Sequence, residues 1–238
     1  MKAVSCLIAL AMVGGAVAQG LGPEEILEKV RSVWQPESFH ARVMIEEHRG
    51  GEPRRWEAEV WSEGEDKALI RILHPEEEAG SGYLVLDDDV WYYSPQAGVS
   101  IQLPALALSA GAFGGVAALE DLFRGTLSEE CEVTVEARDG GWLLTLIPRP
   151  EAPVVWGRLE LQVREDFAPL ELRFLDQRGD LVRVARASRF INVNGKSFPT
   201  VLEIEEASGD RTVERFLEPR IGIDIPDEVF TLEFLEGR

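Results

Sequence analysis

The most regular feature of this sequence is an alternation of apolar and polar residues that starts near residue 38. In SFHARVMIEEH (Ser38–His48), Phe39, Ala41, Val43 and Ile45 alternate with polar neighbours. A period of two is typical of a β-strand with one buried face. Similar runs follow at Arg55–Glu63, Lys67–His74, Gly82–Asp88, Asp89–Ser94, Glu130–Ala137, Gly141–Arg149, Val154–Glu165, Pro169–Asp176, Leu181–Ser188, Lys196–Ala207 and Thr212–Glu218. The pattern predicts about 11 or 12 strands.

One segment before the strands has a helical period instead. In PEEILEKVRSVW (Pro23–Trp34), Ile26, Val30 and Val33 fall on one stripe. Pro23 suits the first turn of a helix, and the acidic residues behind it suit the positive end of the helix dipole. We predict a single amphipathic helix here.

Short turn signals such as Asn194-Gly195 separate the strands, so neighbouring strands are expected to be antiparallel. The alternation predicts a sheet with one apolar and one polar face. Polar-face residues are Glu57, Glu59, Glu160, Gln162, Glu171, Arg173, Glu203 and Glu205. A closed barrel, a sandwich and a curved sheet wrapped around a few helices all satisfy this pattern.

The first 18 residues read as a signal peptide. Lys2 precedes a short apolar core, and Ala16-Val17-Ala18 places small residues where a signal peptidase cleaves. We therefore predict removal of residues 1–18 and a single exported domain over residues 19–238, soluble in the periplasm. Cys6 leaves with the signal, and Cys131 is predicted to be a buried structural thiol.

The charge and the candidate chemistry narrow the function. The formal net charge of -19 and the lack of a basic stripe disfavour nucleic-acid binding. His40, His48 and His74 show no metal-binding spacing, and the segment from Asp87 to Asp89 reads as a hairpin turn. GxSxG and P-loop motifs are absent from the sequence. We predict a protein that is not an enzyme and uses no cofactor or metal.

A stretch from Val90 to Leu119 carries no charged residue, although 28% of the chain is charged. Its Gly, Ser, Gln and Pro content disfavours a membrane span. Two alternatives stay open: ordinary core, or a mobile apolar flap over an apolar cavity. Gly111, Gly114 and Gly115 would allow the flap to move.

Several motifs in and after this stretch resemble the bacterial outer-membrane lipoprotein-sorting proteins, the LolA/LolB-like superfamily. They are DVWYYSP (89–95), IQLP (101–104), GAFGG (111–115), LEDL (119–122) and the ending IDIPDEVFTLEFL (223–235). The sequence departs from the family in lacking a basic residue within QAGVSIQLP (96–104), which suggests a more purely apolar guest.

The resemblance implies a fold and a ligand. The fold would be mainly β: a single curved antiparallel sheet, a half-open barrel, wrapped around a few short helices that form a lid over an apolar cavity. The ligand would be lipoprotein acyl chains or other lipids. The predicted cavity residues are Val43, Ile45, Trp56, Val60, Leu144, Leu146, Leu159, Leu161, Leu172, Phe174 and Leu202, and the predicted lid residues are Trp91, Tyr93, Phe113, Leu122 and Phe123.

The functional hypothesis is therefore a monomeric periplasmic carrier or binding protein for acyl chains, which exchanges them with an envelope donor or receptor and has no catalytic role. Two alternatives remain at this point. One is an envelope sensor or protein-interaction module of the same fold. The other is an exported hydrolase whose catalytic residues come together only in space.

Overall fold

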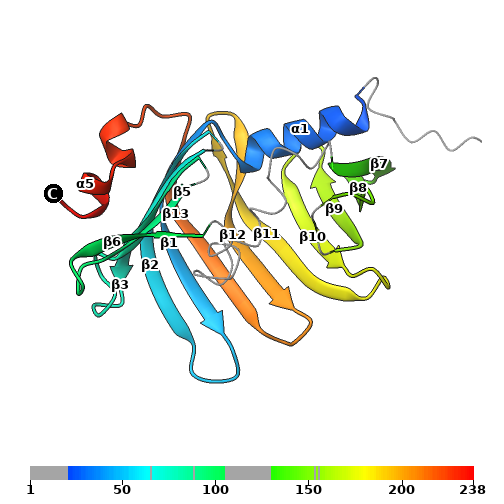
Figure 1. Ribbon diagram of the computed structural model, residues 1–238. Helices are drawn as coiled ribbons and strands as arrows, with labels where there is room; N and C mark the ends of the chain where they lie inside the picture. The colour runs from blue at the N-terminus through cyan, green and yellow to red at the C-terminus, as the bar shows by residue number, and fades with distance from the viewer. Residues whose placement is uncertain (1–20, 65, 88, 105–129, 153, 155) are drawn as a thin grey trace, which may run out of the picture.

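The protein is an open, strongly curved β-sheet with few helices (Figure 1). The computed structural model describes residues 21–64, 66–87, 89–104, 130–152, 154 and 156–238. Its 13 strands form one sheet in the order β6-β5-β4-β3-β2-β1-β13-β12-β11-β10-β9-β8-β7. Every neighbouring pair is antiparallel. Of the three predicted architectures, the curved sheet is the one observed.

The elements follow the chain with short connections. The strands are β1 (Ser38–His48), β2 (Arg54–Glu63), β3 (Lys67–His74), β4 (Gly82–Leu86), β5 (Asp89–Ser94), β6 (Val99–Leu103), β7 (Cys131–Arg138), β8 (Gly141–Pro148), β9 (Arg158–Arg164), β10 (Pro169–Leu175), β11 (Leu181–Val193), β12 (Lys196–Glu206) and β13 (Arg211–Ile221). The helices are α1 (Pro23–Trp34), the 3-10 helix η1 (Asp227–Phe230) and α5 (Leu232–Leu235).

The sheet consists of two meanders joined in the middle. Strands β1 to β6 form the first meander and β7 to β13 the second, and β1 pairs with β13 to unite them. The ends of the sheet, β6 and β7, do not pair with each other. The sheet is therefore not closed, as the half-open barrel prediction required.

The predicted number of strands was too low, because the structure contains 13. The missing strand is β6, whose sequence VSIQL alternates but covers five residues inside the uncharged stretch that the sequence left open between core and flap. It lies at the edge of the sheet, where Val99 and Ile101 keep about half of their surface exposed.

Helix α1 has the predicted bounds and buries Ile26, Leu27, Val30 and Val33. Ile26, Leu27 and Val30 pack on β7 to β12. We call the face of the sheet that α1 contacts the inner face, and the opposite one the outer face. Figure 1 shows α1 crossing the sheet near its upper rim and the C-terminal helices on the other side of β2 to β5.

The C-terminal η1 and α5 pack on the outer face of the first meander. Their buried residues Ile225, Val229, Phe230 and Leu235 join Leu69 and Leu84 in one cluster. Gly82 permits this approach, since a Cβ there would lie 2.2 Å from the carbonyl oxygen of Ile70 and 3.0 Å from Leu235. Any larger residue at position 82 would push the helix and strand apart.

Two turns match their predictions. Asn194 and Gly195 both have positive φ angles, 51° and 82°, and connect Val193 to Lys196 in a two-residue hairpin. Asp87, with a φ of 52°, lies in the turn between β4 and β5. Cys131 is a buried free thiol, as predicted, and burial raises its pKa.

Candidate functional site

The register of the strands places apolar side chains next to one another across the inner face. Paired residues in antiparallel strands point to the same side of the sheet. Val43 of β1 is paired with Ala58 of β2 and Phe216 of β13. Leu161 of β9 is paired with Leu144 and Leu172. The inner face is thus apolar in both meanders.

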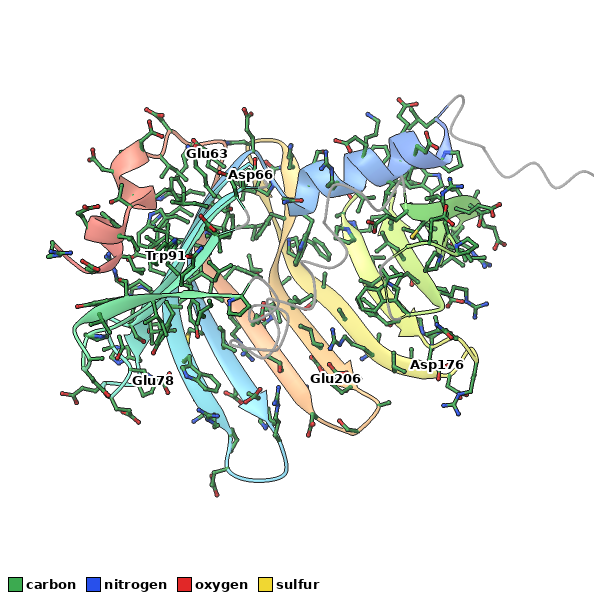
Figure 2. All side chains as sticks on the ribbon, viewed as in Figure 1. Glu63, Asp66, Glu78, Trp91, Asp176 and Glu206 are labelled. Carbon is green, nitrogen blue, oxygen red and sulfur yellow. The ribbon has the colours of Figure 1, made fainter. Side chains whose placement is uncertain are left out.

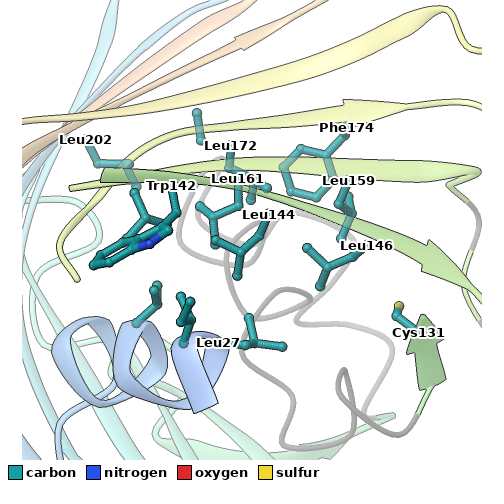
Figure 3. Close-up of a cluster of buried hydrophobic side chains, with 14 of the residues drawn as sticks. Leu27, Cys131, Trp142, Leu144, Leu146, Leu159, Leu161, Leu172, Phe174 and Leu202 are labelled. Carbon is teal, nitrogen blue, oxygen red and sulfur yellow. The ribbon is translucent and has the colours of Figure 1, made fainter. Parts of the chain in front are cut away.

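In the second meander, this face is packed under α1. Leu144, Leu146, Leu159 and Leu161 are almost fully buried. They belong to one cluster with Ile26, Leu27 and Val30 of the helix (Figure 3). Burying such side chains contributes about 1.5–3 kcal/mol each. This half of the inner face is a conventional core between a helix and a sheet.

Aromatic side chains lie where the two meanders meet. Trp34, at the end of α1, stacks on Phe198 of β12 with ring centroids 6.2 Å apart. Phe216 meets both Trp34 and Phe198 edge-on, and Phe39 lies 5.6 Å from Phe198. These rings fix the end of α1 against the central strands.

In the first meander, no described helix packs on the inner face. Half-buried Trp56 and Val60 of β2 lie beside buried Ile70 and Ile72 of β3. Further out, Tyr83 and Tyr92 are 5.0 Å apart between ring centroids. The apolar series ends on β6 with Ile101 and Val99, which are 49% and 51% exposed.

Charged groups surround Trp56 at the rim of this half. The guanidinium of Arg54 lies 4.6 Å from the centroid of the Trp56 ring, and the indole Nε1 donates to Glu78 over 3.2 Å. Figure 2 shows Glu78 and Glu206 at the end of the sheet away from α1. The inner face is therefore apolar in its middle and polar at this rim.

One acidic side chain interrupts the apolar inner face. Glu214 of β13 is paired with Ile45 of β1 and Leu202 of β12, so it points to the inner side. It is 1% exposed, and its Oε1 has no hydrogen-bond partner. Desolvation by burial raises the pKa of this carboxyl to about 8. The group is therefore mostly protonated at neutral pH.

Sequence reasoning did not single out Glu214, although a signal for it exists. In TVERFLE, Glu214 is two residues from Phe216, and a period of two places both on one face. The sequence does not show that this face of β13 is the inner one. The pairing of β13 with β1 and β12 shows it, because Glu214 is paired with Ile45 and Leu202.

On the outer face of the second meander, ion pairs link the strands, in agreement with the polar face predicted there from the sequence. Arg186 donates to Glu171 over 2.9 Å and to Glu205 over 2.6 Å. Arg211 donates to Glu203 over 2.7 Å, which lowers the pKa of the Glu203 carboxyl. Glu171, Glu203 and Glu205 each have an arginine partner, unlike Glu214.

The structure brings most of the predicted ligand-binding residues together on the inner face. They are Val43, Ile45, Trp56, Val60, Leu144, Leu146, Leu159, Leu161, Leu172, Phe174 and Leu202. Trp91 and Tyr93 lie on the outer face instead, packed with η1 and α5. The predicted lid residues Phe113, Leu122 and Phe123 fall outside the described residues.

The three histidines lie apart from one another, each beside a glutamate. His40 Nε2 is 3.0 Å from Glu59, His48 Nε2 is 2.8 Å from Glu46, and His74 Nε2 is 3.9 Å from Glu57. Within the described part of the chain, no group of three or more His, Cys, Asp or Glu side chains could hold a metal ion. Nor does any helix there have the length and apolarity to cross a membrane.

Comparisons with known proteins are consistent with this geometry. A family model described as "Uncharacterized protein" matches residues 64–237. The LolA superfamily protein NE2245 from Nitrosomonas europaea is 25% identical, with a TM-score of 0.71 over 90% of this chain and 100% of its own. The search of curated proteins finds no match.

Two more crystal structures share the fold. A DUF1329 family protein from Desulfovibrio piger is 21% identical, with a TM-score of 0.72 over 89% of this chain and 96% of its own. An outer membrane lipoprotein-sorting protein domain from Vibrio parahaemolyticus is 16% identical, with a TM-score of 0.71 over 89% of this chain and 97% of its own.

Proposed function

Because this chain belongs to the LolA/LolB-like superfamily of outer-membrane lipoprotein-sorting proteins, we propose that it is a periplasmic binding protein or carrier for acyl chains. The chains belong to lipoproteins or other lipids, and they bind the inner face of the sheet without undergoing a reaction. The leader-like residues 1–18 support export to the periplasm.

The observation that carries this proposal is the apolar inner face of the first meander. The second meander uses its apolar inner face to bind α1, so that surface is already occupied within the chain. In the first meander, Trp56, Val60, Tyr92 and Ile101 keep part of their surface exposed. A row of partly exposed apolar side chains on a curved surface is typical of a ligand or partner site.

We therefore propose that the acyl chain lies along β1 to β6 rather than under α1. Leu144, Leu146, Leu159, Leu161, Leu172 and Phe174 then hold the helix and keep the sheet curved. Val43, Ile45, Trp56 and Val60 contact the hydrocarbon. Leu202 lies on β12 between these two groups.

The energetics suit reversible binding. Each methylene removed from water contributes about 0.8 kcal/mol, so a long acyl chain gains on the order of 10 kcal/mol before ordering costs. Such a gain needs neither a charged group nor a catalytic residue. An acceptor with a similar apolar surface can receive the chain at little net cost.

Native mass spectrometry of the protein purified from a cell envelope tests the proposal. We expect acylated species to co-purify at a near-equal ratio and to be displaced by fatty-acyl probes. A lipid-free protein that is indifferent to such probes would contradict the proposal. A stoichiometric envelope protein in place of lipid would favour the interaction-module alternative.

A further inference from the structure

The buried carboxyl of Glu214 lies among apolar side chains of the inner face, and the proposed apolar binding does not use its chemistry. It stands on β13, the central strand that joins the two meanders. Its neighbours across the sheet are Ile45 and Leu202, and Phe216 lies two residues along the same face. A carboxyl group in these apolar surroundings does not stabilise the fold by packing, because its burial costs free energy.

Neighbouring charges do not explain it either. Nearer the rim, Glu47 pairs with Arg49 at 2.8 Å, and Arg183 pairs with Glu206 at 2.6 Å. Those two arginines already have carboxylate partners, and Glu47 is paired with Thr212 rather than with Glu214. Burial is the cause of the raised pKa of Glu214, and no ion pair to this carboxyl occurs among the described residues.

A buried polar atom without a partner costs about 1–3 kcal/mol, so natural proteins keep few of them without a use. The Oε1 atom of Glu214 is such an atom. A ligand that supplied a hydrogen bond would recover this cost on binding. The carboxyl is mostly neutral at pH 7, so it can both donate and accept, which matches an uncharged polar group.

We propose that Glu214 hydrogen-bonds the hydroxyl group of a neutral amphiphile whose hydrocarbon chain lies on the inner face. This inference rests on the proposed function and adds a specificity determinant to it. A hydroxyl donates one hydrogen bond and accepts others, so it complements a protonated carboxyl. Glu214 is then the point where the hydrocarbon ends and the head of the ligand begins.

A matched pair of ligands tests the inference on the delipidated protein. The fluorophore N-phenyl-1-naphthylamine reports apolar binding, and 1-dodecanol and 1-chlorododecane compete for its place at pH 7. The two competitors differ in a hydroxyl against a chlorine atom on the same chain. We expect the protein to prefer the alcohol, with a ratio of dissociation constants on the order of tenfold.

Three variants make the result specific. Glu214→Leu should abolish the preference while binding of the chloride stays within about twofold. Glu214→Gln keeps a neutral donor and acceptor and should retain the preference. Glu203→Gln, on the outer face of the neighbouring strand, should leave both constants unchanged. Thermal unfolding of each variant confirms that it is folded, and the ratio does not depend on stability.

The outcomes separate the two proposals. If the protein binds the fluorophore but shows no preference for the alcohol, or if Glu214→Leu keeps the preference, this inference is wrong and the proposed function stands. If neither the fluorophore nor either competitor binds, the proposed function fails and the inference fails with it.

Discussion

The two meanders of the sheet have similar strands but use their faces differently. In the second meander, α1 covers the inner face and ion pairs cover the outer face. In the first, η1 and α5 cover the outer face, while the inner face is also apolar. The second meander is therefore a two-layer structure, and the first has two apolar faces with a described helix on only one.

This difference is visible in the sequence once the structure is known. Strands β9 and β10 alternate cleanly between apolar and charged residues. Strands β3 to β5 contain runs such as Ala68–Ile70 and Tyr83–Leu86, in which neighbours are all apolar. Strands that are apolar on both faces read as continuous apolar runs. Loss of alternation marks the strands that have a second apolar surface to cover.

The largest expected effect tests whether the two inner faces differ in packing. Leu161→Ala, under α1, should lower the free energy of unfolding by about 3 kcal/mol, because it leaves a cavity in a filled core. The matched Ile101→Ala on β6 should lower it by about 0.5 kcal/mol, because Ile101 is half exposed. Urea denaturation measures both values. Similar losses at the two positions would remove the distinction.

A second prediction concerns the pH dependence of stability at the junction of the meanders. The ordinary pKa of Glu214 is 4.5, and burial raises it to about 8 in the folded state. The folded protein thus retains a proton that the unfolded chain loses, so stability falls as the pH rises from 4.5 to 8.

Glu214→Gln removes this dependence. The variant should be more stable than the original protein by about 2 kcal/mol near pH 6, with the difference vanishing below pH 4.5. Carboxylates with lowered pKa values, such as Glu203, contribute the same pH dependence of stability to both proteins. Their contribution therefore cancels in the difference between the two. Thermal unfolding across this range measures it. A difference that does not change with pH would show that Glu214 is ionised in the folded state.

The third prediction compares the two meanders by their effect on ligand binding. Ile101→Asp places a charge on the inner face of the first meander and should weaken binding of a fatty-acyl probe about tenfold, or about 1.4 kcal/mol. The melting temperature should change little, since the side chain is half exposed. Ile147→Asp, at a similarly exposed position on β8, is the control and should leave binding unchanged. Equal weakening by both variants would contradict the proposed location of the ligand.

The smallest effect is expected on the outer face of the second meander. Arg186→Gln removes two ion pairs, with Glu171 and Glu205, from a partly exposed site. Exposed pairs contribute little, so the free energy of unfolding should fall by about 0.5 kcal/mol, and less in high salt. Denaturation at two salt concentrations measures this. A loss as large as that of Leu161→Ala would mean that the outer face stabilises the sheet as much as the core does.

The sequence by itself determined the local structure. It predicted α1 with its bounds, the antiparallel order of strands, the Asn194-Gly195 hairpin and the charged outer face of β9, β10 and β12. Each of these depends on residues within a few positions of one another, where helical or two-residue periods are directly readable. The edge strand β6 was missed although its five residues alternate, because it is short and lies inside the uncharged stretch.

Only the tertiary structure decided which apolar face meets which partner. Trp91 and Tyr93 read like ligand-facing residues, yet they pack on η1 and α5, which are more than 130 residues away along the chain. Glu214 reads like a solvent-exposed acid, yet the pairing of β13 with β1 and β12 turns it inward. Periodicity shows that a strand has two different faces. Which face is buried depends on long-range packing, and the residues next to one another in the sequence do not specify it.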